Sequence, residues 1–535
     1  MPWFSRFLAT ASIAAWAISF LSAAPSPGDR IAAGERLYRE GLRASGTPVT
    51  GTVQGDVPVS GSQFSCVNCH LRSGMGSSEA AIVAPPINAL ILFAPRETAP
   101  HERAAYGEKS LAAALRTGVD PAGRALDPLM PRYVLDDEDV YSLAAYLRTL
   151  SAAPSPGVGA STLVFATVVT EGVPPARRAA MLGVLNAYFQ SKNAQTRDEI
   201  RRAERAEALK QPMYQAWREW VLRVWELHGP PSSWKGQLDA YYRKEPVFAL
   251  LSGTAEEDWS PIHDWSESHR VPSLLPITDR PALREGDFYT LYFSKGVALE
   301  AQVIATRLAK IHAPARVVQL FHAGGTGEAG ARELRQALQA AGTAASVEDV
   351  TIATQESPAA AMRRGIGSGP PAAMVLWLDR ADLEAISASG AGAAIRTVYL
   401  SATLSDLVPG AALPALGDES ILASSFSLPE EGRLRAKRLE IWLAQRGLPK
   451  DEFRVRDETF FACMMAGEGL MHVKQYLYRD YFLELIDHTA GAAAYASTFP
   501  RLSFGPGQRY LAKGCYLLPL GPNRSAASRD AWVVP

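Results

Sequence analysis

Cysteine and net charge are both scarce in this chain of 535 residues, which has only four cysteines. The 54 basic and 55 acidic residues give a net charge of -1. This balance excludes the basic footprint of a nucleic-acid-binding protein and a basic tail for a membrane surface. After the N-terminal segment, no apolar run is long enough to cross a membrane. The length predicts about three or four compact units.

The N-terminal segment predicts export. Arg6 precedes an apolar run at residues 7–21, and the small residues Ser22, Ala23 and Ala24 follow it. This pattern is typical of a secretory signal peptide at 1–24. An uncleaved membrane anchor stays open as the alternative, because residues 7–24 reach the lower length limit for spanning a bilayer. In both cases we expect the folded part in the periplasm, with membrane contact only if the signal is uncleaved.

Cys66, Cys69 and His70 form the motif CVNCH, for which three chemistries compete. A structural zinc site needs four ligands, but the next cysteines are Cys463 and Cys515. A redox dithiol would follow a buried strand, whereas the preceding residues are polar. Two thiols at this spacing reach both vinyl groups of one porphyrin, and the adjacent histidine becomes the proximal iron ligand. The motif therefore predicts one covalently bound haem c.

The iron needs a ligand on its second face, and Met130 is the candidate. It lies 60 residues after His70, in a segment rich in glycine and proline that can present a side chain from a loop. Met75 is too close to His70 in the chain to reach the opposite face. The residues after Met130 predict a helix that ends near Leu150 and has Asp136 as its N-cap.

Together these segments resemble a class I cytochrome c over residues 29–150. The resemblance lies in the order of an opening helix at 34–42, the CVNCH motif, the APPINAL stretch, the LMPRY loop and a final YLRTL helix. It implies an all-α cytochrome c domain at 25–150. A polar insert before Phe64 departs from the family pattern.

The resemblance also implies a set of site residues. Met130 would be the distal iron ligand, and a carbonyl near Pro85 or Pro86 would accept the N–H of the His70 ring. Tyr133 and Tyr146 would line the haem pocket. Met/His ligation raises the reduction potential and leaves the iron no open position. We therefore expect a carrier of single electrons.

The remainder of the chain has a different pattern. Residues 151–160, SAAPSPGVGA, predict a linker. After it, buried strands alternate with helical segments, which predicts an α/β fold with parallel sheets and helices on both faces. The strands are expected at 163–170, 247–253, 315–322, 372–379 and 397–402.

Residues 161–535 resemble the type I periplasmic binding proteins, the two-lobed receptors for branched-chain amino acids and related solutes. The resemblance lies in the order of the elements and in the VFALLSGT and SHRVPSLLPIT segments. It implies one lobe at about 161–293 and 421–485, and a second at about 294–420 and 486–535. In that family the loops after the first strands hold the ligand, which implies contacts from Thr170, Ser252, Gly253 and Thr254.

Two features of this part could mislead. The segment at 197–229 reads as helical where the family has its second strand, so we expect a reshaped or closed cleft. The GTGEAG segment at 325–330 matches a dinucleotide fingerprint, but an exported protein meets no nicotinamide pool, and a glycine-rich turn is favoured instead. For Cys463 and Cys515, a disulfide and two buried thiols both stay open.

The sequence thus predicts a periplasmic electron carrier, which is not an enzyme, fused to a solute-binding-like module. Its partner would be a periplasmic dehydrogenase or a component of the respiratory chain. One alternative is a solute-binding or sensing protein of an ABC-type uptake system with an accessory haem domain. Another is oxidation of a bound solute, with the haem as the acceptor. The expected small ligand is an amino acid or an organic acid.

Overall fold

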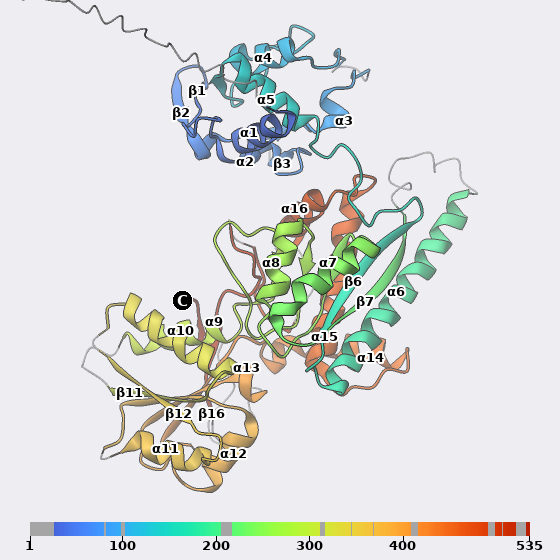
Figure 1. Ribbon diagram of the computed structural model, residues 1–535. Helices are drawn as coiled ribbons and strands as arrows, with labels where there is room; N and C mark the ends of the chain where they lie inside the picture. The colour runs from blue at the N-terminus through green and yellow to red at the C-terminus, as the bar shows by residue number, and fades with distance from the viewer. Residues whose placement is uncertain are drawn as a thin grey trace, which may run out of the picture. The chain divides into compact units, whose positions relative to one another are not determined.

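The computed structural model divides the chain into two compact units, Met1–Ala152 and Ala153–Pro535 (Figure 1). It describes residues 26–535 apart from 80–81, 98–101, 205–216, 311–315, 344, 368, 408–415, 491–497, 505–506 and 521–530. The signal segment expected at 1–24 lies outside the described residues. None of the helices in the described part is long and apolar enough to span a membrane.

Helices form the core of unit 1. The longer ones are α1 (Pro27–Glu40), α4 (Glu108–Thr117) and α5 (Asp137–Leu147), and the short ones are α2 (Val67–His70) and α3 (Ala89–Leu92). The predicted N-cap of α5 is confirmed, because the Asp136 carboxylate accepts the Asp139 N–H at 2.8 Å. Helices α1 and α5 pack closely where Gly34 meets the backbone of Ser142, since a side chain at Gly34 would collide with the Ser142 carbonyl.

Unit 1 departs from the expected all-α fold by a small antiparallel sheet. The polar insert before Phe64 forms β1 (Thr50–Val53) and β2 (Val57–Ser60), and β1 also pairs with β5 (Arg132–Val134). A second hairpin consists of β3 (Ser77–Glu79) and β4 (Ile82–Ala84). The insert is thus ordered by strand pairing, and it is held against the segment that follows Met130.

The first lobe of unit 2 contains a parallel sheet in the order β10-β9-β8-β6-β7. Alternate residues of β6 face opposite layers, with Phe165 packed beneath α6 and α15 and Ala166 beneath α7 and α8. The strands are β6 (Thr162–Thr170), β7 (Glu219–Leu227), β8 (Ala249–Leu251), β9 (Ser273–Leu274) and β10 (Thr290–Leu291). The helices are α6 (Pro175–Glu204), α7 (Trp234–Lys244), α8 (Ser260–His269), α14 (Pro429–Ala444), α15 (Phe453–Val473) and α16 (Arg479–Ala490).

The second lobe contains a seven-stranded sheet in the order β12-β11-β13-β14-β15-β16-β17, in which β16 runs antiparallel to both of its neighbours. Val317 and Val318 face opposite sides of this sheet and belong to separate cores. The strands are β11 (Arg316–His322), β12 (Ser346–Ile352), β13 (Ala373–Trp377), β14 (Thr397–Ser401), β15 (Glu419–Ser424), β16 (Cys515–Leu520) and β17 (Trp532–Val533). The helices are α9 (Val297–Leu308), α10 (Thr326–Ala340), α11 (Pro358–Ile366), α12 (Arg380–Ala388) and α13 (Ala402–Ser405). The predicted parallel α/β architecture is confirmed.

Three segments connect the two lobes, after β10, after β15 and before β16 (Figure 1). The first and third run side by side, because Leu511 N–H donates to the Tyr292 carbonyl at 3.1 Å and Ala512 N–H to the Phe293 carbonyl at 2.7 Å. The chain returns to the first lobe after β15, which ends at Ser424, close to the expected position 421, but the last crossing lies near residue 511 and not at 486. Strand β15 belongs to the second lobe, and Leu511 still packs in the core of the first.

The helical prediction for residues 197–229 is wrong in its second half. Residues 219–227 form β7, which pairs with β6 along its whole length. Trp220 and Trp225 face opposite sides of the sheet and are buried in different cores. Arg223 and Glu226 lie at the exposed edge, and these charged residues gave the segment its helical appearance.

Cys463 and Cys515 are free, buried thiols in two different lobes, so they form no disulfide. The glycines of the GTGEAG segment have a packing role. Side chains at Gly327 or Gly330 would collide with Trp377, so both glycines let α10 approach β13.

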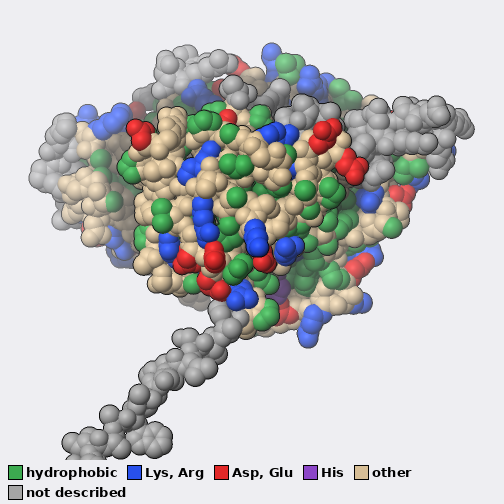
Figure 2. Space-filling view, turned by 90° about the horizontal axis from the view of Figure 1, so that it is seen from above, with side chains coloured by type: hydrophobic (Ala, Val, Ile, Leu, Met, Phe, Trp, Pro, Cys, Tyr) green, Lys and Arg blue, Asp and Glu red, His purple; other side chains and the backbone are tan. Residues whose placement is uncertain are grey.

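Basic and acidic side chains alternate on the face of the molecule seen in Figure 2, with hydrophobic side chains between them. Ion pairs with partly exposed side chains in unit 1 include Arg30–Glu138 at 3.0 Å and Arg116–Asp137 at 2.7 Å. The mixture agrees with the net charge of -1.

Candidate haem attachment site and polar network between the lobes

Cys66, Cys69 and His70 lie on one helical turn. Cys66 is the N-cap of α2, and its carbonyl accepts the N–H of His70 at 2.9 Å. Residues at positions i, i+3 and i+4 of a helix share a face, so both thiols and the imidazole are presented on the same side. Both thiols are free, with Cys66 half-buried and Cys69 exposed. The turn therefore fits two thioether bonds to one porphyrin.

The His70 ring is buried, with 6% of the residue exposed, and its Nδ1 lies 2.9 Å from the Pro85 carbonyl oxygen. A carbonyl can only accept, so the proton is on Nδ1 and the Nε2 lone pair is available to a metal. Burial lowers the pKa of His70, which keeps the imidazole neutral, as an iron ligand must be. The residues present fit the proximal side of a haem c.

An apolar cavity adjoins the attachment turn. Its lining includes Cys66 and Tyr133 together with aliphatic side chains of α1, α4 and α5, namely Leu37, Leu115 and Leu143. The Tyr133 hydroxyl donates to the Phe64 carbonyl at 2.6 Å, which fixes the start of the attachment segment against β5. Such an apolar surface suits a porphyrin face and keeps water away from it.

The other predicted haem-site residues have separate surroundings. Met130 is half-buried beside the cluster that contains Cys66 and Tyr133, and it lies at the turn before β5. Pro86 is half-buried next to Pro85. Tyr146 of α5 packs against Tyr38 of α1, with their ring centroids 5.4 Å apart. The roles of Met130, Pro86 and Tyr146 at the haem stay predictions.

Tyr38 was missed by the sequence reasoning. It is completely buried, and its hydroxyl donates to the Leu71 carbonyl at 2.6 Å, directly after His70. This bond anchors the end of the attachment turn to α1. The available signal was an aromatic residue on the buried face of the opening helix.

In unit 2, the four predicted solute contacts lie together at the carboxyl ends of β6 and β8. The Thr170 N–H donates to the Thr254 carbonyl at 3.3 Å, and the Thr170 hydroxyl donates to Glu257 at 3.0 Å. Ser252 and Thr254 are completely buried, and their hydroxyl oxygens have no hydrogen-bond partner among the described residues. Ser252 and Gly253 both have positive φ, at 55° and 111°. A role of these residues in solute binding stays a prediction.

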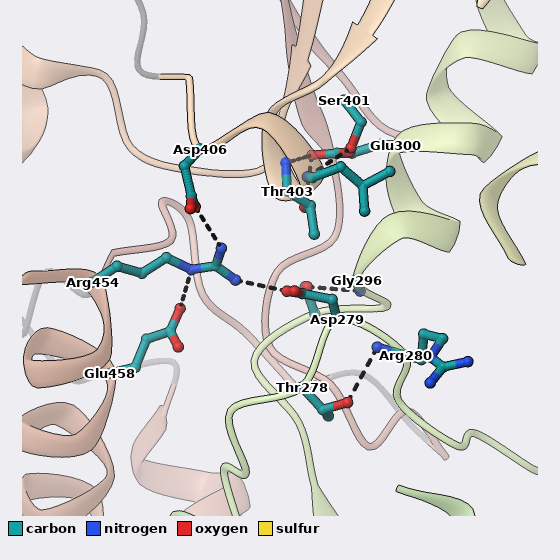
Figure 3. A network of polar contacts seen from close by, with 12 residues as sticks. Thr278, Asp279, Arg280, Gly296, Glu300, Ser401, Thr403, Asp406, Arg454 and Glu458 are labelled. Atoms are coloured by element: carbon teal, nitrogen blue, oxygen red, sulfur yellow. Dashed lines mark hydrogen bonds and ion pairs between the residues drawn. The ribbon is translucent and has the colours of Figure 1, made fainter. Parts of the chain in front are cut away.

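A polar network lies where the connecting segments meet (Figure 3). At its centre is the Arg454 guanidinium of α15, which contacts Asp279 at 2.8 Å, Glu458 at 3.0 Å and Asp406 of the second lobe at 3.5 Å. It also lies over the ring of Phe426 in the second connecting segment, 4.6 Å from the ring centroid. One cation thus joins both lobes through side chains that are far apart in the sequence.

Two buried carboxyl groups accompany this network. Burial raises the pKa of Glu458 to about 7 against the opposing effect of Arg454, and it raises the pKa of Glu300 to about 7. Glu300 accepts hydrogen bonds from the Thr403 N–H at 3.0 Å, from the Thr403 hydroxyl at 2.8 Å and from the Ser401 hydroxyl. Burial therefore keeps both carboxyl groups protonated to a higher pH than an exposed glutamate.

The turn at 66–70, with its buried, neutral imidazole, has the arrangement that a c-type haem unit requires. Residues 61–151 match the family model for cytochrome c, and the chain therefore contains a cytochrome c domain. No curated protein is a significant match to the chain.

Several solved binding proteins are similar to the chain. A leucine binding protein LivK from Thermotoga maritima is 13% identical, with 67% of this chain and 95% of that chain covered and a TM-score of 0.45. A branched-chain amino acid ABC transporter protein from Thermus thermophilus with bound valine is 12% identical. The match covers 69% of this chain and 98% of that chain, with a TM-score of 0.45. A solute binding protein from R. palustris in complex with benzoate is 14% identical. The match covers 67% of this chain and 92% of that chain, with a TM-score of 0.47. These values are too low to carry an argument about ligand or activity.

Proposed function

We propose that this protein is a periplasmic electron carrier, with one haem c attached through Cys66 and Cys69, fused to a solute-binding-like module. The single observation that carries the proposal is the buried His70 ring, whose Nδ1–H is held by the Pro85 carbonyl and whose Nε2 is left for iron. The match of this segment to cytochrome c supports it. When bound, the haem would take up and release single electrons.

The residues of the chain set the conditions for this chemistry. His70 would hold the iron from one side and Met130 from the other, and the apolar cavity beside Cys66 would exclude water. A donor such as a periplasmic dehydrogenase and an acceptor in the respiratory chain are the proposed partners.

Binding of carbon monoxide tests whether both axial positions of the haem iron are filled by side chains. If His70 and Met130 fill both axial positions, the reduced full-length protein does not bind carbon monoxide, whereas Met130→Ala does and has a lower midpoint potential. Met75→Ala is the matched control and should leave both properties unchanged. Carbon monoxide binding by the unmodified protein, or an unchanged potential in Met130→Ala, would remove Met130 from the iron.

The second candidate is a solute-binding or sensing protein of an ABC-type uptake system, with an accessory haem domain. The two-lobed form of unit 2, with three connecting segments around Arg454, favours it, because such junctions allow lobes to close on a ligand. Titration of the full-length protein with amino acids and organic acids, followed by tryptophan fluorescence, tests this candidate. Residues 26–152 contain no tryptophan, so the signal reports on unit 2. A flat response over the whole panel would argue against a solute pocket.

A further inference from the structure

His263, Glu267 and Asp287 form a cluster in the first lobe of unit 2, and none of them belongs to the Arg454 network. His263 and Glu267 lie one turn apart on α8, and Asp287 lies in the loop before β10. One ligand atom of each residue lies within 4.8 Å of the other two. We propose that this cluster is a binding site for a divalent transition-metal cation, with zinc as its preferred occupant.

The imidazole of His263 is the main reason for this proposal. His263 is completely buried, and its Nδ1 lies 3.0 Å from the Tyr292 hydroxyl. Its Nε2 lies 3.0 Å from Asp287 Oδ2, but this contact is not a hydrogen bond, and Nε2 has no hydrogen-bond partner among the described residues. A buried imidazole nitrogen therefore lies close to a carboxylate oxygen that is off its N–H axis.

This geometry is the one that two ligands of a shared ion adopt. With metal–ligand bonds of about 2.1 Å at the tetrahedral angle, the nitrogen and the oxygen of two zinc ligands are about 3.4 Å apart, and each lies off the other's bonding axis. A hydrogen bond at the same separation would instead place the oxygen on the N–H axis. The Asp287 oxygen lies off the His263 N–H axis, as in the first arrangement, and the 3.0 Å separation would open by about 0.4 Å around a bound zinc ion.

Backbone N–H groups orient both carboxylates. Glu267 Oε1 accepts the N–H groups of Tyr289 and Thr290, both at 2.8 Å, and Oε2 accepts that of Phe288 at 3.0 Å. Asp287 Oδ2 accepts the N–H of Arg284 at 2.8 Å. These donors use only part of the acceptor capacity of the two groups, and they hold the remaining lone pairs in place.

Other charged groups near the cluster do not occupy it. The Arg284 guanidinium forms its ion pair with Asp264, which lies next to His263 on α8. The Tyr292 hydroxyl holds His263 through Nδ1, as an outer-shell partner does for a metal-binding histidine.

The ligand set defines the class of cation. One imidazole with two carboxylates suits zinc, whereas calcium and magnesium prefer sites built of oxygen alone. A bound cation would tie α8 to the loop before β10. Tyr292 comes directly after β10 and begins the first segment that connects the two lobes. The metal would therefore stabilise the first lobe next to this connecting segment.

The experiment uses the full-length protein loaded with haem. After equilibrium dialysis against zinc chloride, bound zinc is counted by elemental analysis, and its ligands are identified by X-ray absorption at the zinc edge. We expect one zinc per chain in a shell of nitrogen and oxygen, with no sulfur. Calcium chloride at the same concentration should not displace it.

Asp287→Asn is the decisive variant, because the amide oxygen can still accept the Arg284 N–H while the charged ligand is lost. We expect its dissociation constant for zinc to rise at least about tenfold. His472→Ala is the matched control, since His472 forms an exposed pair with Glu468 on α15 at 3.2 Å, with the same spacing of four residues. Equal zinc binding by all three proteins, sulfur in the shell, or no retained zinc would overturn the proposal and leave His263 and Asp287 as an ion pair.

Discussion

Replacement of Glu300 by glutamine should make unit 2 more stable at alkaline pH relative to the unmodified protein. Glu300 is completely buried on α9, and its carboxylate is held by Ser401 and Thr403. Burial raises the pKa of Glu300 from 4.5 to about 7. Glutamine has the shape of the protonated side chain, but it does not ionise.

The sign and the size of the expected change in the free energy of unfolding follow from this pKa. The folded state holds the Glu300 proton more tightly than the unfolded state, so its contribution to stability is complete below pH 4.5 and is lost as the pH rises through about 7. The difference between the two pKa values corresponds to about 3 kcal/mol at 1.36 kcal/mol per pH unit. The free energy of unfolding of Glu300→Gln, minus that of the unmodified protein, should therefore rise by about 3 kcal/mol between about pH 4 and pH 8.

Urea unfolding of the full-length protein, followed by tryptophan fluorescence at several pH values, measures this difference. Glu458 has a raised pKa as well, but it is present in both proteins and cancels in the comparison. Glu430→Gln, with an exposed side chain, is the control and should give a difference that does not change with pH. Parallel pH curves for Glu300→Gln and the unmodified protein would refute the reasoning.

Two further predictions concern packing and charge. Gly34→Ala should destabilise unit 1 by about 1–3 kcal/mol in thermal unfolding followed by haem absorbance, because the new methyl group would collide with the Ser142 carbonyl, whereas Gly107→Ala faces open space and serves as the control. Arg454→Met should destabilise unit 2 by about 3 kcal/mol in urea unfolding, because it leaves the buried Glu458 without its cation. Adding Glu458→Gln should restore part of that loss; no restoration would contradict the pairing.

Much of the fold was predictable because local signals agreed with the final structure. The buried runs that became β6, β11 and β13 are short and rich in branched aliphatic residues, and Asp136 is followed by acidic residues that suit a helix N-terminus. The β7 strand was missed because its charged residues lie at an edge of the sheet, where strands also carry solvent-facing side chains. Only its pairing with β6 reveals the strand.

The CVNCH site and the Arg454 network also differ in how far the sequence could predict them. CVNCH carries its chemistry within five consecutive residues, so the sequence alone pointed to a haem. The Arg454 network could not be predicted, because Asp279, Asp406 and Arg454 meet only when three connecting segments come together. The insert before Phe64 was noted as polar, but its pairing with β5 depends on residues about eighty positions further along the chain.

The attachment of haem itself is the most direct test of the account. The full-length protein is produced in a host that matures c-type cytochromes, purified and extracted with acidic acetone. The account predicts that the red pigment stays with the polypeptide, at one haem per chain, and that it is lost when Cys66 and Cys69 are both replaced by serine. A colourless protein, or pigment that passes into the acetone, would contradict it.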